Sequence, residues 1–269
     1  MPIIHAIISD LDDTLLTEDH RMTERTVQAL QRVMRQGVKV VLASGRSAAS
    51  IRPFVRKVQT PSPYIAYNGA QILDAATDQI LTGNEISVEM ARQVLRWFEA
   101  QDVYVQYYEG DDWFYETPCA FSEDYGKATG IVGKQAAGTL SQCVERPTAK
   151  LLAVATPEHV QALIPAARTE FGNALSITTS KPYFIEVTSP EATKGNAVKK
   201  LAAMLGLSPE TTICAGDSLN DMSMLEWSCL PVSVKNAREE VQRIAWRVAG
   251  DGHRDGIAAL LDELIPPQA

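Results

Sequence analysis

The sequence has few cysteines and histidines, and neither residue type is grouped. Its four cysteines, at positions 119, 143, 214 and 229, are far apart and form no Cys-X-X-Cys pair, and its four histidines are equally scattered. Such spacing disfavours a disulfide scaffold and a zinc site. It favours reduced thiols in a cytoplasmic protein.

Long hydrophobic runs and clusters of positive charge are also absent. No apolar run approaches the roughly 18 residues that a membrane span needs. The N-terminal segment MPIIHAIISD has no basic region and its apolar run stops at Asp10, so it does not resemble a signal peptide. The formal net charge of −8 disfavours nucleic-acid and acidic-membrane partners. The oligomeric state, monomer or small homo-oligomer, stays open.

The chain does hold enough apolar residues for a large core. Of its 269 residues, 45% are hydrophobic and 22% are charged, which is typical of a globular protein long enough for two domains. The apolar segments at residues 3–8 and 38–42 do not alternate strictly with polar residues, which favours parallel strands buried on both faces. Between them, a helix is expected to begin after Thr23 and to end at Gly37. This order predicts a right-handed βαβ unit.

The middle of the chain has a different order of elements. Residues 104–116 alternate around a Glu-Gly-Asp turn and predict an antiparallel hairpin, which is followed by a strand–helix–strand–strand pattern. A helix at residues 194–205, with Thr193 as its expected N-cap, and the apolar strand at residues 211–216 then restore the α/β pattern. We therefore predict an α/β fold in which residues 1–83 and 189–269 form a doubly wound, mostly parallel sheet, with an α+β domain inserted at residues 84–188.

Polar side chains follow the predicted strands at the points where the strands end. In open α/β sheets, ligands bind at the carboxyl ends of the strands, where residues distant in sequence meet. The candidates are Asp10 and Asp12 after the first strand, Ser44, Gly45 and Arg46 after the second, Asp217, Asn220 and Asp221 after residues 211–216, and Lys194 at a helix start.

Calcium and magnesium are two possible ligands for these carboxylates. A calcium-binding EF-hand loop needs Gly at its sixth position and Glu at its twelfth, but counting from Asp10 places Leu15 and Arg21 there. Magnesium fits better, because it takes one or two carboxylates and completes its shell with water and phosphate. Asp10, Asp12 and Asp217 can supply the carboxylates, and a divalent cation would offset their mutual repulsion.

Donors for a phosphate group are also present. Ser44 supplies a hydroxyl, and Gly45 allows close approach to the backbone. Lys194 adds a positive charge, and Asn220 adds an amide. The sequence therefore predicts a site for a small phosphorylated molecule and Mg²⁺.

Four short segments together resemble the motifs of a known family. They are DLDDTL at residues 10–15, ASGR at 43–46, TKG at 193–195 and GDSLND at 216–221. In this order and context they resemble the haloacid dehalogenase (HAD) superfamily of phosphohydrolases, and the position of the insert resembles the C2-type cap of the Cof-type, or IIB, subgroup. The resemblance covers essentially the whole chain, and it implies a Rossmann-like core with an inserted cap.

The resemblance also implies roles for the motif residues. Asp10 would be the nucleophile that becomes an aspartyl-phosphate, and Asp12 would be the general acid and base. The Asp10 side chain, the Asp12 backbone carbonyl and Asp217 would hold Mg²⁺, with Asp221 in support. The phosphoryl oxygens would be bound by the Leu11 backbone N–H, Ser44, Gly45, Lys194 and Asn220.

Three positions depart from the family pattern. The fourth residue of the first motif is often Gly but is Asp13 here; it is interpreted as a solvated or helix-capping carboxylate with no assigned task. The second motif often has Thr and here has Ser44, which keeps the hydroxyl. Val234 and Lys235 stand where Met-Gly often precedes Asn-Ala.

Two further polar positions keep both a structural and a functional interpretation. Asn68-Gly69 is a type I′ hairpin signal, and the family places a similar pair near the mouth of the active site, so Asn68 is a candidate substrate contact. Arg46 either pairs locally or binds substrate. The aromatic residues of the hairpin are interpreted as sheet packing rather than as a substrate lid.

The predicted function is Mg²⁺-dependent hydrolysis of small phosphorylated metabolites, such as sugar phosphates or flavin mononucleotide. A phosphomutase using the same site is the near alternative, because the sequence does not show whether water reaches a phosphorylated Asp10. A phosphoaspartate receiver domain is remote, since its acidic pair precedes the phosphoacceptor strand and it has no large cap. A binding protein without activity is disfavoured because no motif residue is missing.

Overall fold

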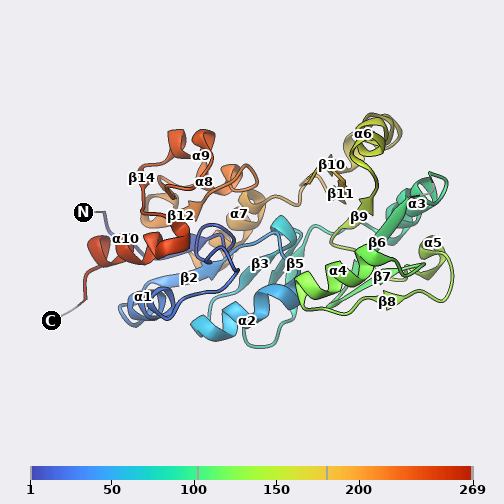
Figure 1. Cartoon of the computed structure of the whole chain (residues 1–269). Coiled ribbons are helices and arrows are strands. Elements are labelled where there is room, and N and C mark those ends of the chain that lie inside the picture. Colours follow the sequence, from blue (N-terminus) through green and yellow to red (C-terminus); the bar gives the residue numbers. More distant parts are fainter. Residues whose placement is uncertain (1, 102, 180, 268–269) are drawn as a thin grey trace. The chain divides into compact units, whose positions relative to one another are not determined.

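The computed structural model describes residues 2–101, 103–179 and 181–267. The chain divides into two compact units (Figure 1). The first comprises Met1–Ser47, Ile51–Gly83 and Thr193–Ala269, and the second comprises Ala48–Ser50 and Asn84–Ala192. In the sequence, the main segment of the second unit, Asn84–Ala192, is thus inserted between Gly83 and Thr193 of the first.

A five-stranded parallel sheet forms the centre of the first unit. Its spatial order is β14-β13-β12-β1-β2. The central strand pairs Ile8 with Cys214 on one side and with Val41 on the other. Its strands are β1 (Ala6–Ser9), β2 (Lys39–Leu42), β12 (Thr212–Gly216), β13 (Leu230–Ser233) and β14 (Arg247–Val248). The predicted α/β fold with a mostly parallel sheet is confirmed.

Helices cover this sheet because its central strands, β1 and β12, are buried on both faces. Thr23 and Thr193 cap α1 and α7 by accepting the N–H of Thr26 and Asn196, as the sequence predicts. Helices α1 and α10 lie side by side (Figure 1). The helices are α1 (Glu24–Arg35), α2 (Ala48–Val58), α7 (Lys194–Leu205), α8 (Met222–Leu225), α9 (Glu239–Ile244) and α10 (Gly256–Leu264). One core cluster joins Ile8, Val41 and Cys214 of the sheet to Val198, Leu225 and Val241 of α7, α8 and α9.

A small antiparallel sheet follows the second strand and its helix. It contains β3 (Tyr64–Ala66), β4 (Gln71–Leu73) and β5 (Ile80–Gly83). Between β3 and β4, Asn68 and Gly69 both have positive φ, 54° and 100°, and Ala70 N–H donates to the Tyr67 carbonyl at 3.1 Å, as a type I′ turn requires. A Cβ at residue 69 would lie 2.2 Å from the Thr193 carbonyl oxygen, so space as well as φ demands glycine there.

The second unit is built on a mixed, mostly antiparallel sheet of six strands in the order β10-β11-β9-β6-β7-β8. The strands are β6 (Tyr104–Glu109), β7 (Asp112–Tyr115), β8 (Lys134–Gln135), β9 (Leu151–Val154), β10 (Ser176–Thr178) and β11 (Phe184–Thr188). The helices are α3 (Val88–Glu99), α4 (Ala120–Thr129), α5 (Leu140–Cys143) and α6 (Pro157–Phe171). The predicted α+β pattern and the β6–β7 hairpin are confirmed. Tyr107, Tyr108 and Trp113 are buried within the unit, in keeping with sheet packing.

The first strand differs from its predicted extent. It begins at Ala6 rather than at residue 3, because both neighbouring strands start to pair with it at Ala6. Ile3 precedes that pairing and is 71% exposed. All four cysteines are free thiols, and no helix within the described residues is both long enough and apolar enough to cross a bilayer.

Candidate active site

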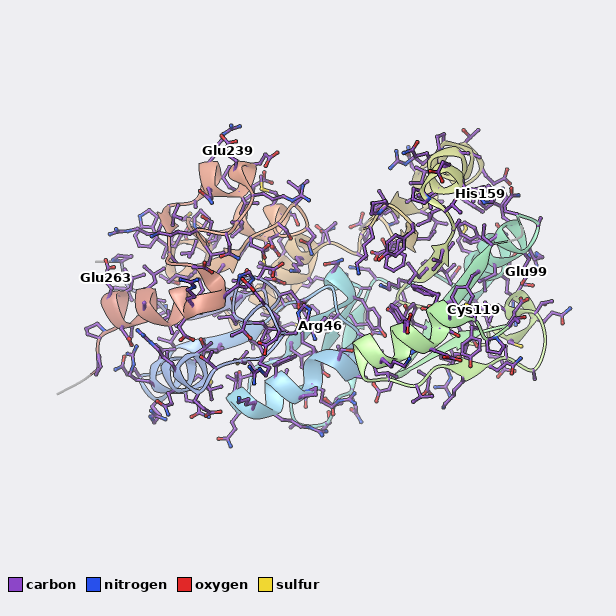
Figure 2. The ribbon with its side chains drawn as sticks, viewed as in Figure 1. Arg46, Glu99, Cys119, His159, Glu239 and Glu263 are labelled. Carbon is purple, nitrogen blue, oxygen red and sulfur yellow. The ribbon has the colours of Figure 1, made fainter. Side chains whose placement is uncertain are left out.

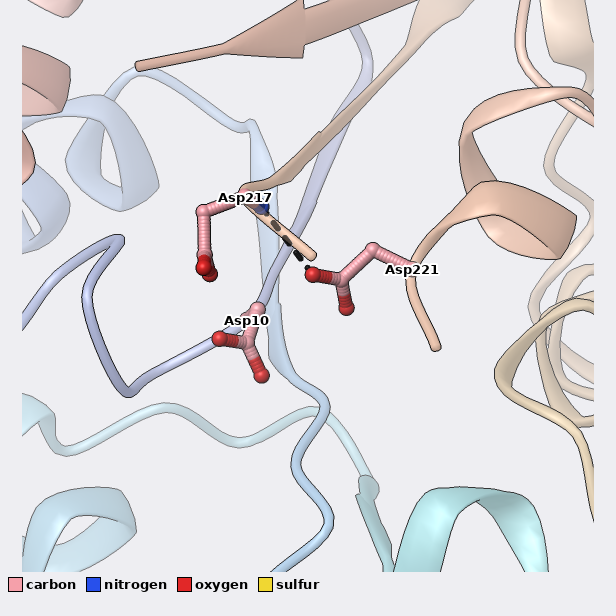
Figure 3. Close-up of side chains that lie close together, drawn as sticks. All are labelled: Asp10, Asp217 and Asp221. Carbon is pink, nitrogen blue, oxygen red and sulfur yellow. Dashed lines mark hydrogen bonds between the residues drawn. The ribbon is translucent and has the colours of Figure 1, made fainter. Parts of the chain in front are cut away.

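Three buried carboxylates converge at the carboxyl ends of β1 and β12. Asp10 follows β1, and Asp217 and Asp221 lie on the loop after β12 (Figure 3). One oxygen of each can be chosen so that all three lie within 4.8 Å of one another. The Asp217 N–H donates to Asp221 Oδ2 at 3.0 Å, which holds the second and third carboxylates together. The parallel pairing of β1 with β12 brings these residues together although they are far apart in sequence.

Lys194 lies among these carboxylates and is completely buried. Its ammonium donates to Asp10 Oδ1 and, at 2.5 Å, to Asp221 Oδ1. It is the first residue of α7, and the next residue, Gly195, lets α7 approach Ser223, whose carbonyl oxygen would lie 2.4 Å from a Cβ at residue 195. The cluster therefore holds one lysine, paired with two of its three carboxylates, and has excess negative charge.

The pKa values of the cluster reflect this excess. Burial raises the pKa of Asp10 well above its ordinary value; the charges of Asp221 and Asp217 raise it further, while Lys194 opposes them. Burial and then Asp221 raise the pKa of Asp217 to about 6. Burial alone would lower the pKa of Lys194, but Asp10 and Asp221 raise it overall. A hard divalent cation would relieve this repulsion, and three carboxylates are a suitable oxygen donor set for one.

The Asp12 carboxylate points to a different partner. Arg46 (labelled in Figure 2) binds it in a bidentate manner, with Nε 2.7 Å from Oδ2 and Nη2 2.5 Å from Oδ1. The Nδ1 of His20 lies 3.1 Å from Asp12 Oδ1. Burial would raise the pKa of Asp12, but Arg46, with His20, lowers it overall. Arg46 therefore does pair locally, and its part in substrate binding stays a prediction.

Ser44, Asn68 and Asn220 form a connected polar group. Ser44 Oγ accepts the Arg46 N–H at 3.1 Å, and the Ser44 carbonyl accepts the Asn68 N–H at 3.0 Å. Asn220 Nδ2 donates to Asn68 Oδ1 at 2.8 Å. Gly45 lies beside this amide, since a Cβ there would be 3.0 Å from Asn68 Oδ1. The turn after β3 thus reaches the residues that follow β2 and β12.

All the predicted site residues lie in the first unit. Leu11 is buried, and its carbonyl accepts the N–H of Leu15 at 2.8 Å, which bends the chain sharply after β1. The structure connects the others as two groups. The first contains Asp10, Asp217, Asp221 and Lys194, and the second contains Asp12, Arg46, Ser44, Gly45, Asn68 and Asn220, with Arg46 hydrogen-bonded to both Asp12 and Ser44. Their individual roles stay predictions.

Two contacts of the site were not predicted from the sequence. Thr14 Oγ1 donates to Asp217 Oδ1 at 2.9 Å. Its place at the end of the Asp-X-Asp-X-Thr motif was a signal for such a contact. His20, which contacts Asp12, carries no comparable signal, because a lone histidine in a polar loop predicts nothing specific.

Asp13 has a structural explanation that its sequence position did not reveal. Its φ is 59°, a left-handed conformation that glycine and, less readily, Asp and Asn adopt. Its carboxylate Oδ1 lies 2.8 Å from His253 Nε2. The Asp13 side chain is 56% exposed, which agrees with the solvated interpretation. The helix-capping interpretation was wrong, because no helix begins beside Asp13 and α1 starts only at Glu24.

The Asp13–His253 pair is expected to make the free energy of unfolding depend on pH. The hydrogen bond to Asp13 is the main cause that raises the pKa of His253 above 6.5, and Asp251 and Glu18 add to it. A raised folded-state pKa means that the stabilisation is complete below the ordinary pKa and is lost as the pH rises through the raised value. His253→Gln is expected to lower the free energy of unfolding, and its loss relative to wild type should be larger at about pH 6 than at about pH 9. Urea unfolding at the two pH values measures this loss, and His159→Gln on α6 is the control. A loss of the same size at both pH values would contradict the prediction.

The α/β fold and the carboxylate cluster define a class of hydrolase. Residues 7–261 match the model of the haloacid dehalogenase-like hydrolase family, and the chain belongs to this family. The chain is 28% identical to phosphatase YwpJ of Bacillus subtilis, covering 96% of this chain and 99% of that protein. It is also 28% identical to the pyridoxal phosphate phosphatase YbhA of Escherichia coli, covering 95% of this chain and 96% of the relative.

Solved structures show the same fold. A haloacid dehalogenase-like hydrolase from Bacteroides thetaiotaomicron superposes with a TM-score of 0.91 at 22% identity, over 97% of this chain and 100% of that one. A HAD subclass IIB sugar phosphatase superposes with a TM-score of 0.79 at 22% identity, over 96% and 98% of the two chains. The predicted family resemblance is confirmed.

Proposed function

We propose that the protein is a Mg²⁺-dependent phosphatase that hydrolyses small phosphorylated metabolites through a phosphorylated Asp10. The observation that carries this proposal is the buried cluster of Asp10, Asp217 and Asp221, in which Lys194 pairs with Asp10 and Asp221. A folded protein has no structural need for three buried carboxylates with one lysine, because burying unpaired charge is costly. A charged ligand explains the arrangement.

Two aspartates would divide the chemistry between them. An Asp10 carboxylate oxygen would attack phosphorus, and the bond from phosphorus to the alcohol oxygen would break while that oxygen takes a proton from Asp12. Asp12 would carry this proton only after leaving its bidentate pair with Arg46, which lowers its pKa in the ligand-free protein. Asp12 would then accept a proton from water as the water attacks the aspartyl-phosphate, which releases phosphate and restores Asp10. Lys194 orients Asp10, and Arg46 with His20 orients Asp12 in the ligand-free protein.

The remaining groups would bind the metal and the phosphate. Asp10, Asp217 and Asp221, with the Asp12 backbone carbonyl, would hold Mg²⁺, which when bound neutralises negative charge on the reacting phosphoryl group. Donors around the cluster would bind the phosphoryl oxygens, and most of the catalysis would be positioning and charge stabilisation. These donors are the Leu11 N–H, Ser44, Gly45, Lys194 and Asn220, while Arg46 and Asn68 are candidate contacts to the substrate.

The class of substrate is supported by the family relatives. A pyridoxal phosphate phosphatase and a sugar phosphatase both act on small phosphorylated molecules. The phosphomutase alternative uses the same residues. An assay that measures both free phosphate and isomerised sugar phosphate distinguishes a phosphatase from a phosphomutase. Release of phosphate without isomerisation supports the phosphatase function. Isomerisation without release of phosphate would support the phosphomutase function instead. The cytoplasmic location and the oligomeric state stay predictions.

Metal dependence is the direct test of the site. EDTA is expected to reduce hydrolysis of an aryl phosphate to background, and Mg²⁺ is expected to restore it, because the carboxylates repel substrate without a cation. Asp217→Asn is expected to raise the Mg²⁺ concentration for half-maximal activity by about tenfold or more. Exposed Asp124, which pairs only with Lys127 among the described residues, supplies the matched control Asp124→Asn. Full activity in EDTA would reject the proposed metal site.

A further inference from the structure

The backbone and side chain of Asp13 are held by residues that lie more than 220 positions away. Asn236 Nδ2 donates to the Asp13 carbonyl at 2.7 Å, and Asn236 Oδ1 accepts the Gly252 N–H at 2.8 Å. His253 Nε2 lies 2.8 Å from Asp13 Oδ1. We call Asn236, Gly252 and His253 the Asp13 clamp.

The clamp also fits tightly against the backbone. A Cβ at residue 252 would lie 2.3 Å from the Asp13 carbonyl oxygen and 3.0 Å from the Thr14 carbonyl oxygen, so only glycine allows this approach. Asp13 itself has the left-handed φ of 59°. The clamp therefore holds a sparsely populated backbone conformation by contacts to both the carbonyl and the carboxylate.

The two neighbours of Asp13 both contact the proposed site. Asp12 precedes it, and its carboxylate is the proposed acid and base. Thr14 follows it and donates to Asp217 Oδ1. The segment that carries Asn236 also supports Asp217, because the Arg238 N–H donates to the Asp217 carbonyl at 2.9 Å. One loop after β13 thus contacts the backbones of both Asp13 and Asp217.

We propose that Asn236 and His253 are positioning residues for catalysis, which act through Asp13 to set the placement of Asp12 and Thr14. This inference rests on the proposed phosphatase function. Neither residue contacts the carboxylates that would react or bind metal, so each acts through the Asp13 backbone or side chain. A displacement of about 1 Å at a reacting group is enough to lower turnover by about 100-fold.

The test compares both sides of the clamp with an aryl phosphate as substrate. Asn236→Ala removes the hydrogen bonds to Asp13 and Gly252, and Asp13→Ala removes the carboxylate and strains the left-handed φ. Each is expected to lower kcat by about 10- to 100-fold with KM changed less than about twofold. Asp13→Asn keeps an acceptor for His253 and tolerates the same φ, so it is expected to retain most of the wild-type kcat. Asn173→Ala, at an exposed position in the second unit, is the matched control.

A purely structural clamp would give a different pattern. It would lower the melting temperature of Asn236→Ala while leaving kcat of the folded enzyme near wild type, and that result would overturn the proposal. A rise in KM at constant kcat, or Asp13→Asn as impaired as Asp13→Ala, would overturn it too. If Asn236→Ala does not fold, Asp13→Gly provides a second test, because glycine keeps the backbone conformation and removes the carboxylate. This variant is expected to lower kcat by about fivefold. A kcat equal to that of wild type would reject positioning through the Asp13 carboxylate and His253.

Amide hydrogen exchange separates this proposal from the proposed function. In Asn236→Ala, the amides of Thr14, Leu15 and Leu16 are expected to exchange at least about tenfold faster than in wild type, because the clamp no longer restrains the turn after β1. Exchange elsewhere in the sheet should not change. Unchanged exchange at these amides would reject the clamp whether or not the protein hydrolyses phosphate. If wild type releases no phosphate from any substrate but Asn236→Ala still exchanges faster at these amides, only the phosphatase function is rejected.

Discussion

Replacing Asp10 by Asn is expected to abolish phosphate release, with a loss in kcat of at least about 1,000-fold, while the protein stays folded. The amide is nearly the same size as the carboxylate, but it is a poor nucleophile and cannot form the aspartyl-phosphate. The change also removes one negative charge from a buried cluster in which burial and repulsion already raise the pKa of Asp10. The metal-free variant should therefore unfold at a temperature no lower than that of wild type.

Two measurements make this result specific. Acid-quenched wild type incubated with substrate should yield a peptide phosphorylated at Asp10, and the variant should yield none. Asp124→Asn makes the same chemical change at an exposed position and should keep wild-type turnover. Near-wild-type hydrolysis by Asp10→Asn would remove Asp10 from the mechanism.

Replacing Lys194 by Met should give the largest loss of stability. The lysine is completely buried and is the ion-pair partner of Asp10 and Asp221, so its removal leaves these carboxylates unpaired in the interior. Breaking a buried pair in this way costs about 3–5 kcal/mol in free energy of unfolding. Activity should fall with it, because the nucleophile loses the group that orients it.

The pH dependence of this variant distinguishes charge from packing. Without Lys194, the carboxylates bind protons more tightly in the folded state than in the unfolded state, so their penalty shrinks as the pH falls. Asp217, with a pKa already raised to about 6, should contribute to this change around neutral pH. Urea unfolding at about pH 5 and about pH 8 should therefore show the larger loss at the higher pH. Exposed Lys199 on the same helix provides the control Lys199→Met, which should cost less than about 0.5 kcal/mol. Equal losses in the two variants would contradict the role of the buried pair.

The sequence predicted the parts of the fold that depend on local pattern. The apolar segments became β1 and β2, Thr23 and Thr193 became helix caps, and the family motifs fell at the ends of parallel strands. Strand periodicity, capping and glycine turns depend on neighbours within a few residues, so they can be inferred without knowing the packing. The start of the first strand was predicted three residues too early, because its true start is set by pairing with its two neighbouring strands.

The partners of individual side chains could not be inferred in the same way. Asp12 pairs with Arg46, 34 positions away, and Asp13 pairs with His253, 240 positions away. The sequence placed Arg46 near the site but left its partner open, and nothing in it linked Asp13 to His253. Such pairs depend on where loops meet after the helices have packed on the sheet.

The three aspartates of the first motif show where this division falls. Their residue types, together with Ser44, Lys194 and Asp217, already predicted a site for Mg²⁺ and phosphate, and the family resemblance implied a nucleophile at Asp10 and an acid and base at Asp12. The tertiary structure decided that Asp10 faces Lys194, Asp12 faces Arg46, and Asp13 turns away to His253. The physical reason is the backbone: Asp13 has a left-handed φ in the turn after β1, and contacts from the distant Asn236 and His253 hold its carbonyl and its carboxylate.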